Sequence, residues 1–447
     1  MKKLPKKITI TLLILSFLTL TIAFFYQQDY FSTKKPIEIP KKRIILNIDE
    51  TDSTDFTELE RLSTSKETVF LDTLAERLIR QWEIVGMSVA VVKDGRLVYA
   101  KGFGYADKER NIRMKPHHLL RMASISKLFT ATAIMKLVEE GKLSLTDKVF
   151  GNQGIIKKYN HLVVDSLVFK IEIQHLLTHT GGWRNQLRTD PMFVPVKVAE
   201  IMKVPSPIAF DDVMKYMLAQ KGYFPAGAFY DYSNFGYCVL GEVVAQISGK
   251  SYQKYLQEDL LLPAKIKRIK IGKNRYKDRF AHETRYYEPK KTSLNLSIYS
   301  PKDSASRVYE GNDTESLGAA GGLIASALDI AKFACAIDNF ATRPDILREE
   351  TIKKMAFPIS KTDTLGKRVL GWKQVLPDKW WRTGNLASTS STLSRYNNGY
   401  TWVLVTNTGS WRGPYFPYEM EAMMQKALRE VKFKDQDLFP LAEKLER

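Results

Sequence analysis

Several serines in the chain are each followed three positions later by a lysine. On a helix, residues three apart lie on one face, so the lysine amine reaches the serine hydroxyl. A serine hydroxyl needs such a base to attack a carbonyl near neutral pH. Among these pairs are Ser63/Lys66, Ser124/Lys127 and Ser251/Lys254. Only Ser124 lies where an irregular segment leads into a helical pattern, so backbone amides at the helix start can face a developing oxyanion.

Two further polar elements follow Ser124 and Lys127 along the chain. Tyr232-Ser233-Asn234 comes about 110 residues after Ser124, and Arg382-Thr383-Gly384 comes about 150 residues later, between β-rich runs. A tyrosine phenol has an ordinary pKa near 10, and a neighbouring lysine lowers that pKa toward a value useful for proton transfer. A serine, a lysine and a tyrosine together predict nucleophilic attack on an amide or ester carbonyl.

With these three elements the sequence resembles the serine β-lactamase and penicillin-binding protein superfamily. It is most similar to the class C β-lactamase branch, which includes D-stereospecific peptidases and carboxylic esterases. The resemblance covers about residues 75 to 430. Two more segments carry it: IEIQHLLTHTGG, which ends at Gly182, resembles the family's LLTHTSG, and Ala320–Phe333 resembles its GGL and S-x-x-D-x-x-x-F pattern. Within these segments we expect structural roles for His179 and for the Gly321-Gly322 pair.

The resemblance implies a catalytic role for three residues. Ser124 would be the acylated nucleophile and Lys127 would accept its proton. Tyr232 would pass the proton to the leaving group and help to activate the water that removes the acyl group. The backbone amide of Asn385 would join that of Ser124 in an oxyanion hole.

The resemblance also implies a substrate-binding role for the polar elements. Asn234 would hydrogen-bond both the substrate and Lys127. Arg382, Thr383 and Gly384 would bind substrate along a strand edge, with the arginine supplying positive potential. The family usually has Lys or His where this chain has Arg382. Because arginine does not deprotonate usefully in proteins, we expect Arg382 to bind a carboxylate with two hydrogen bonds, and β-lactam hydrolysis stays open.

The chain opens with a segment that predicts export. MKKLPKK carries four lysines, and Ile8–Phe25 is a run of 18 residues without a charge, close to the roughly 20 that cross a bilayer as a helix. We therefore expect residues 1–29 to be a signal anchor or transmembrane segment, with cleavage as a signal peptide as the alternative. The lysines would stay inside, which places the rest of the chain in the periplasm or at the cell surface, or in the medium if the segment is cleaved.

The remaining sequence predicts one large domain after a linker. Residues 30–66 are polar and predict the linker, residues 67–435 the hydrolase domain and residues 436–447 a C-terminal tail. Lys93-Asp94-Gly95 between two β-rich runs predicts a hairpin, and β-rich runs return near the C-terminus. We therefore expect an α/β (α+β) fold of the β-lactamase/transpeptidase type, in which a mixed antiparallel sheet built from both ends of the domain is flanked by helices. A helical subdomain, about residues 140–325, would be inserted between them.

Composition and charge exclude several other functions. The formal charge of +19 is densest in Lys265–Phe280, but no nucleic-acid motif accompanies it, so we expect a solvated or membrane-facing basic surface and no nucleic-acid partner. Cys238 and Cys335 lie among apolar residues and predict buried, inert thiols. The six histidines show no metal-ligand spacing, so neither a metal site nor another cofactor is expected.

Two functions remain for the predicted site. The first is an extracytoplasmic serine hydrolase that cleaves an amide or ester of a small molecule or peptide through an acyl-enzyme on Ser124. The second is a receptor of the same fold that binds cell-wall peptides or β-lactams with slow or absent turnover. The nature of the substrate and the oligomeric state stay open at this point.

Overall fold

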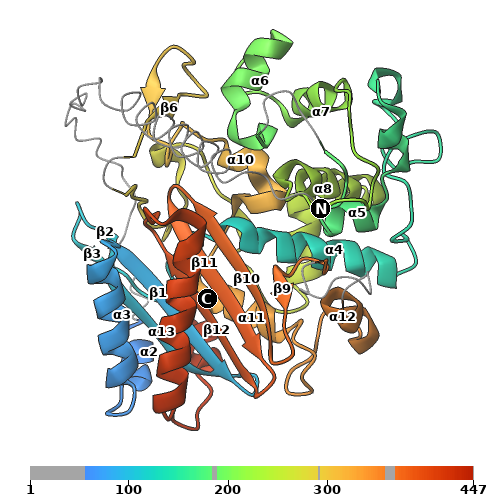
Figure 1. Ribbon diagram of the computed structural model, residues 1–447. Helices are drawn as coiled ribbons and strands as arrows, with labels where there is room; N and C mark the ends of the chain where they lie inside the picture. The colour runs from blue at the N-terminus through green and yellow to red at the C-terminus, as the bar shows by residue number, and fades with distance from the viewer. Residues whose placement is uncertain (1–55, 184–188, 290–291, 358–367, 446–447) are drawn as a thin grey trace, which may run out of the picture. The chain divides into compact units, whose positions relative to one another are not determined.

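The computed structural model describes residues 56–183, 189–289, 292–357 and 368–445. Its main sheet has seven strands in the order β3-β2-β1-β12-β11-β10-β9, and every pair in it is antiparallel. The strands are β1 Gly86–Lys93, β2 Arg96–Asp107, β3 Ile112–Arg113, β9 Gln374–Val375, β10 Lys379–Leu386, β11 Thr389–Tyr396 and β12 Tyr400–Thr406. β1 pairs with β12 from Met87↔Thr406 to Lys93↔Tyr400. The predicted sheet, built from both ends of the domain, is therefore confirmed (Figure 1).

Tight turns join neighbouring strands. Asp94 and Gly95 connect β1 to β2 with φ angles of 48° and 72°, so the predicted hairpin is present. Gly399 closes the β11–β12 turn with a φ of 86°. Positive φ at the glycines of such turns avoids the steric cost that a side chain would carry.

Two hydrophobic clusters cover the two faces of the sheet. Val89 and Val91 of β1 belong to one cluster, and their neighbours Ala90 and Val92 belong to the other, as the alternation of side chains along a strand requires. Helices α3 (Val69–Gln81) and α13 (Phe416–Glu430) supply the first cluster, and they lie side by side over that face in Figure 1. Helices α4 (Ser126–Glu139) and α11 (Ala327–Cys335) supply the second.

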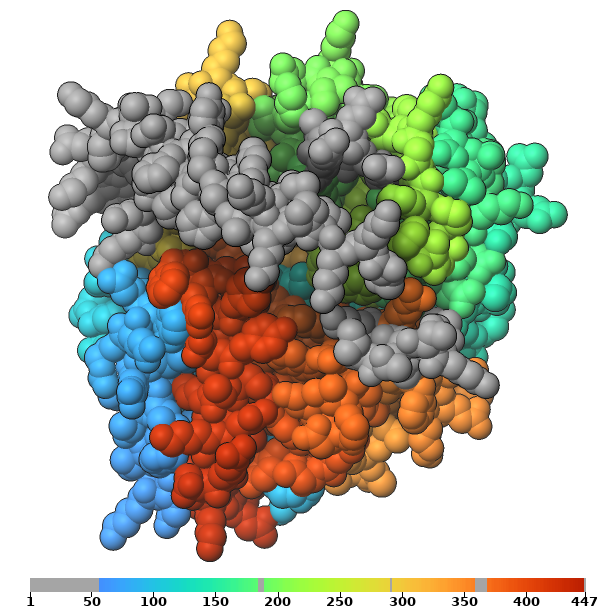
Figure 2. All heavy atoms as spheres, in the orientation of Figure 1, coloured from blue at the N-terminus to red at the C-terminus, as the bar shows by residue number. Residues whose placement is uncertain are grey.

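The middle of the chain is mostly helical and joins the second cluster. Its helices and short strands are α5 Ile173–Leu177, α6 Pro195–Met202, α7 Phe210–Leu218, α8 Asn234–Ser248, α9 Tyr252–Tyr255, α10 Thr314–Leu317, β4 Leu120–Arg121, β5 Lys270–Ile271, β6 Asn295–Leu296, β7 Ser304–Ala305 and β8 Leu323–Ala325. A further helix, α12, spans Glu349–Ala356. In Figure 2 the blue and red atoms from the two ends of the domain lie side by side, and the green atoms of the middle adjoin them. The exact limits of a helical subdomain stay a prediction.

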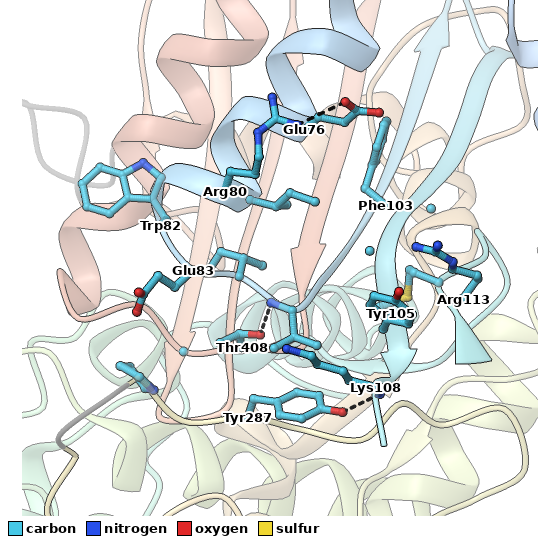
Figure 3. Close-up of a pocket in the computed structure, with 18 of the residues that line it drawn as sticks. Glu76, Arg80, Trp82, Glu83, Phe103, Tyr105, Lys108, Arg113, Tyr287 and Thr408 are labelled. Atoms are coloured by element: carbon cyan, nitrogen blue, oxygen red, sulfur yellow. Dashed lines mark hydrogen bonds and ion pairs between the residues drawn. The ribbon is translucent and has the colours of Figure 1, made fainter. Parts of the chain in front are cut away.

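A cavity of about 910 Å³, here called the α3–β2 cavity, lies between α3 and the outer edge of β2. Trp82 and Glu83 line it from the end of α3, Phe103 from β2, and Tyr287 and Lys108 from neighbouring loops (Figure 3). None of the predicted site residues lines it.

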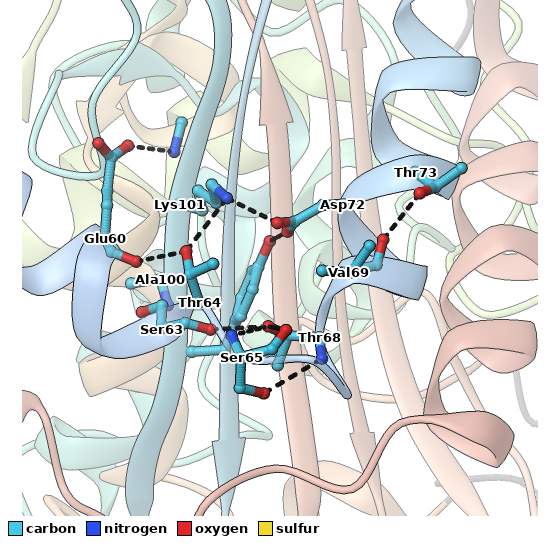
Figure 4. A network of polar contacts seen from close by, with 12 residues as sticks. Glu60, Ser63, Thr64, Ser65, Thr68, Val69, Asp72, Thr73, Ala100 and Lys101 are labelled. Carbon is cyan, nitrogen blue, oxygen red and sulfur yellow. Dashed lines mark hydrogen bonds and ion pairs between the residues drawn. The ribbon is translucent and has the colours of Figure 1, made fainter.

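The predicted linker extends too far toward the C-terminus. Residues 57–63 form helix α2 (Thr57–Ser63), in which Leu59 is fully buried. The Ser63 hydroxyl accepts a hydrogen bond from the Ala100 amide at 2.9 Å, and the Glu60 carboxylate accepts one from the Gly102 amide at 3.0 Å (Figure 4). The structure contradicts a linker that reaches residue 66, because these contacts fix the segment to strand β2.

The predicted C-terminal tail is also part of the folded domain. Residues 439–445 form helix α14 (Phe439–Leu445). Leu438, Phe439 and Ala442 are buried in the second cluster, and the Leu438 amide donates to the Leu97 carbonyl at 2.8 Å. Burial of these apolar side chains accounts for the order of a segment that looked polar in sequence. Across the described residues no helix combines the length and apolar character needed to cross a membrane, and residues 1–29 lie outside them.

Candidate active site

Ser124 lies in a short, constrained turn directly before helix α4. It occupies a 3₁₀ turn, Ala123–Ile125, and Ala123 has a φ of 49°, which costs about 1–3 kcal/mol for a residue with a side chain. Contacts on both sides hold this backbone. The Met122 amide donates to the Leu323 carbonyl at 3.0 Å, and the Ser391 hydroxyl donates to the Met122 carbonyl at 2.7 Å. The strained turn is therefore fixed by β8 and β11.

Lys127 and Tyr232 both converge on the Ser124 hydroxyl. The Tyr232 hydroxyl donates to Ser124 Oγ at 2.8 Å, and Lys127 Nζ donates to the same oxygen at 3.3 Å. Lys127 Nζ also lies 4.8 Å from the centre of the Tyr232 ring. The structure thus brings together the three residues that the sequence predicted as catalytic.

The Lys127 ammonium is buried and has three hydrogen-bond acceptors. Besides Ser124, it donates to Asn234 Oδ1 at 2.6 Å and to the Ala320 carbonyl at 2.5 Å. Burial lowers the pKa of Lys127 below its usual value, whereas the three acceptors compensate for the lost hydration of the charged form. The predicted contact between Asn234 and Lys127 is confirmed. The Ala320 carbonyl shows that the AGGL segment helps to hold the lysine.

Tyr232 has a phenol suited to proton transfer near neutral pH. Burial raises its pKa, but the charges of Lys127 and Arg382, together with hydrogen bonds to Lys127 and Ser124, outweigh that effect and lower the pKa to about 8. The residue as a whole is 40% exposed. Its hydroxyl, however, points inward to Ser124 and Arg382. The tyrosine is therefore open to a ligand while its oxygen stays in the polar cluster.

The start of helix α8 positions Tyr232 and Asn234. Ser233 caps this helix by accepting a hydrogen bond from the Gly236 amide at 2.9 Å, as serine commonly does at a helix start. The Asp190 carboxylate accepts from the Asn234 amide at 2.5 Å, and burial raises the pKa of this aspartate. Sequence reasoning did not identify Asp190, because only the fold brings it to the beginning of α8.

Arg382 has partners other than the predicted carboxylate. Its side chain is 2% exposed. Nη2 donates to Tyr232 Oη at 2.9 Å, Nε to the Ser124 carbonyl at 2.8 Å, and Nη1 to the Trp372 carbonyl at 3.3 Å. All three guanidinium nitrogens thus have partners inside the protein. Two of the five guanidinium N–H groups lie beyond these three bonds, so carboxylate binding by Arg382 stays a prediction, and its charge lowers the pKa of Tyr232.

Strand β10 carries the other predicted binding residues past the nucleophile. A Cβ atom on Gly384 would collide with the Met122 carbonyl and the Ser391 hydroxyl, so a glycine is required for this close approach. The neighbours of Gly384 are Thr383, whose hydroxyl accepts from Lys373 Nζ at 3.1 Å, and Asn385. Among the described residues, β9 pairs with β10 only at Trp380 and Trp381. The segment from Arg382 onward therefore has no described strand on that side, as the predicted substrate edge requires.

His179 is a neighbour of the tyrosine that sequence reasoning treated as structural. Its ring centre lies 4.3 Å from that of Tyr232 and 5.0 Å from that of Tyr237. Nδ1 accepts a hydrogen bond from the Ser233 amide at 3.2 Å, and the backbone adopts a φ of 56°. Burial, with the charges of Arg382 and Lys127, lowers the pKa of His179 well below its usual value. A neutral imidazole therefore supports the ring of Tyr232.

The other sequence candidates have structural roles. Ser63 binds α2 to β2, and Ser251 accepts a hydrogen bond from the Lys254 amide at 3.3 Å at the start of α9. Cys238 and Cys335 are buried and free, and burial raises the pKa of both thiols. Within the described ranges, no cluster of His, Cys, Asp and Glu has the arrangement of a metal site.

Comparisons with known proteins place the chain in a family. The family model described as Beta-lactamase matches residues 71–417. Protein flp of Staphylococcus aureus (strain MW2) is 28% identical over 219 residues, which are 49% of this chain and 41% of that protein. The chain thus matches about two fifths of the length of that relative.

Solved structures show the same fold. The octameric penicillin-binding protein homologue from Pyrococcus abyssi is 23% identical with a TM-score of 0.61, over 82% of this chain and 79% of that one. D-amino acid amidase from Ochrobactrum anthropi SV3 is 19% identical with a TM-score of 0.62, over 82% of this chain and 98% of that one.

Proposed function

Since the chain belongs to the Beta-lactamase family, we propose that it is an extracytoplasmic serine hydrolase that cleaves an amide or ester through an acyl-enzyme on Ser124. The observation that carries this proposal is the convergence of Tyr232 Oη at 2.8 Å and Lys127 Nζ at 3.3 Å on Ser124 Oγ. A nucleophile with two proton-transfer groups in hydrogen-bond reach is the arrangement that covalent catalysis requires.

In the acylation step Tyr232 acts as the general base. With a pKa of about 8, roughly a tenth of the phenol is ionised at pH 7. The phenolate takes the Ser124 proton while the serine oxygen attacks the carbonyl carbon and forms a tetrahedral intermediate. The phenol then returns the proton to the leaving nitrogen or oxygen as its bond to carbon breaks.

Lys127 and Arg382 stabilise the charged form of that base. Lys127 was expected to accept the serine proton, but its contact with Ser124 is longer than that of Tyr232, and it is held by Asn234 and Ala320 as well. The lysine therefore supports the phenolate electrostatically. Both cations lie in a largely buried cluster, where their effect on a nearby negative charge is stronger than in water.

The acyl group is released by the same groups in reverse order. Tyr232 takes a proton from water, the resulting hydroxide attacks the acyl carbon, and Ser124 leaves with the proton from the phenol. The amides of Ser124 and Asn385 bind the oxyanion in both steps. Hydrogen-bond donors aimed at this developing charge supply a large share of such rate enhancements.

The substrates to test first follow from the names of similar proteins. A penicillin-binding protein homologue and a D-amino acid amidase share the fold, so amides and esters of D-amino acids, a peptide that ends in D-Ala-D-Ala and a β-lactam form the first panel. The apolar run at residues 8–25 supports an export signal or anchor and hence action on substrates outside the cytoplasm.

The rival function, a receptor, differs from the hydrolase in turnover. The protein is incubated with a chromogenic ester and, separately, with a fluorescent penicillin. The hydrolase predicts continuous release of product from the ester, which stops in the Ser124→Ala variant. Stable labelling of the protein without product release would support the receptor, and absence of acylation by either reagent would contradict both functions.

A further inference from the structure

A second cavity begins where the catalytic strand ends. It encloses about 490 Å³ and is lined by Asn385 and Leu386 of β10, by Trp411, and by loop residues that include Arg307 and Asn312. Asn385 is also the proposed second donor of the oxyanion hole. The cavity therefore shares one residue with the proposed oxyanion hole, and its volume lies in the range that accommodates a small organic group.

The lining of this cavity combines apolar and uncharged polar side chains with one positive charge. Phe193, Leu386 and Trp411 supply apolar surface. Arg307 is the single charged residue among the described lining residues, which include no carboxylate. Such a lining suits an apolar chain that ends in an anion, since the guanidinium binds carboxylates through paired hydrogen bonds.

The backbone that carries Arg307 is anchored, whereas its side chain is exposed. Asn312 Nδ2 donates to the Arg307 carbonyl at 2.6 Å. The next carbonyl, of Val308, accepts from Nη1 of the buried Arg121 at 2.6 Å. Arg121 lies three residues before Ser124, so the loop is connected to the segment that positions the nucleophile. The charge of Arg307 also acts on Glu288, but that carboxyl lines the α3–β2 cavity and not this one.

Arg307 and Arg382 thus have different roles. The three guanidinium nitrogens of Arg382 donate to Tyr232, Ser124 and Trp372, and its side chain is 2% exposed, so it is held inside the protein, whereas the side chain of Arg307 is exposed. We infer that the 490 Å³ cavity binds the acyl part of an anionic substrate, and that Arg307 recognises its carboxylate. This inference rests on the proposed acyl transfer to Ser124.

The position of Tyr232 assigns the cavity to the acyl side of the scissile bond. The leaving group must lie next to Tyr232, because the phenol returns the proton to it. Tyr232 is not among the lining residues, whereas Asn385, beside the reacting carbonyl, is. A substrate that places its carbonyl at Asn385 and its leaving group at Tyr232 extends its acyl chain toward Arg307.

The test compares two esters that differ only in the charge at the far end of the acyl chain. Mono-4-nitrophenyl adipate ends in a carboxylate, and its methyl ester is neutral. We expect Arg307→Gln to lower kcat/KM for the anionic ester about five- to tenfold and to leave the neutral ester within about twofold. Arg307→Lys is expected to restore part of the preference. Arg77→Gln, which removes an exposed arginine from α3 outside this cavity, is the control.

Each outcome decides the inference. Equal loss for both esters in Arg307→Gln would overturn it while the proposed function stands, because the neutral ester would still report turnover by Ser124. A selective loss for an ester with an anionic leaving group, such as 4-carboxyphenyl acetate, would overturn the assignment to the acyl side. Failure of the wild-type protein to hydrolyse either ester would contradict the proposed function and the inference with it.

The preference for the anionic ester is also expected to fall with added salt in the wild type and not in Arg307→Gln.

Discussion

The active site around Ser124 and the α3–β2 cavity differ in how their charges are held. At Ser124, two buried cations, Lys127 and Arg382, surround one phenol and lower its pKa to about 8. In the α3–β2 cavity the charged groups form separate ion pairs near the surface, such as Lys115 with Glu60 at 2.6 Å. Ion pairs that stay partly in contact with solvent, as this one does, contribute less to stability and perturb their neighbours more weakly than charges in a fully buried cluster.

This difference teaches that volume is a poor guide to chemistry in this protein. The α3–β2 cavity, at about 910 Å³, is the larger space, but none of its described lining residues is a serine, and no base is directed at a nucleophile there. The active site is recognised by two features: hydrogen bonds from two side chains converge on the Ser124 hydroxyl, and the pKa of Tyr232 is shifted toward neutrality. Substitutions in the two regions are therefore expected to have very different effects.

The largest effect is expected for the nucleophile itself. Ser124→Ala removes the atom that forms the acyl bond, so kcat should fall by about 10⁴-fold or more. The surrounding turn is held by backbone contacts of Met122, so thermal unfolding should change little. Hydrolysis of a chromogenic ester, with circular dichroism melting as the control, measures both quantities. Full activity in this variant would exclude Ser124 as the nucleophile.

The next effect is expected for the base. Tyr232→Phe removes the phenol oxygen and should lower kcat/KM about 10²- to 10³-fold. In the wild type the active form is the phenolate, so kcat/KM should rise with pH and level off above the pKa of about 8. The variant should lose this rise. An unchanged pH profile in Tyr232→Phe would contradict the assignment of the base.

A smaller effect is expected for the arginine behind that base. The charge of Arg382 lowers the pKa of Tyr232, so Arg382→Gln should move the rising part of the pH profile to higher pH and reduce activity at pH 7 by about tenfold. Arg382→Lys keeps the charge and should move the profile less. Measurement of kcat/KM for a neutral ester from pH 6 to pH 10 tests this. A profile that stays at the wild-type position in Arg382→Gln would show that the arginine does not act on the phenol.

The smallest effect is expected in the α3–β2 cavity. Lys108 is exposed there, and only its backbone amide donates to the Tyr287 hydroxyl, at 2.7 Å. Lys108→Ala keeps that amide, so kcat/KM should remain within about twofold and the melting temperature should hardly change. The same ester assay and melting curve apply. A loss comparable to that of Arg382→Gln would show that the cavity takes part in the reaction.

The sequence predicted the active-site residues where the reactive side chains belong to a short local motif. Ser124 and Lys127 are one helical turn apart, and the order of the later Tyr-x-Asn and Arg-Thr-Gly elements predicted that distant segments meet around them. The sheet was predictable as well, because the β-rich runs at both ends of the domain need a partner to cover them.

What the sequence left out depends on tertiary contacts. No pattern in the chain indicates that the Asp190 carboxylate accepts a hydrogen bond at the start of α8. Nor does any pattern indicate that Arg382 donates hydrogen bonds to Tyr232 and to two backbone carbonyls. The predicted linker and tail boundaries were wrong because the apolar residues of these segments, among them Leu59 and Phe439, alternate with charged residues. Only the fold shows that each is buried.

The most direct test of the account is the identity of the acylated residue. The protein is mixed briefly with a 4-nitrophenyl ester, and the reaction is quenched in acid. The protein is then digested with a protease, and the masses of the peptides are measured by mass spectrometry. The account predicts that the peptide containing Ser124 gains the mass of the acyl group, and that the Ser124→Ala protein gains none. Acylation at a different residue, or equal acylation of the Ser124→Ala protein, would contradict it.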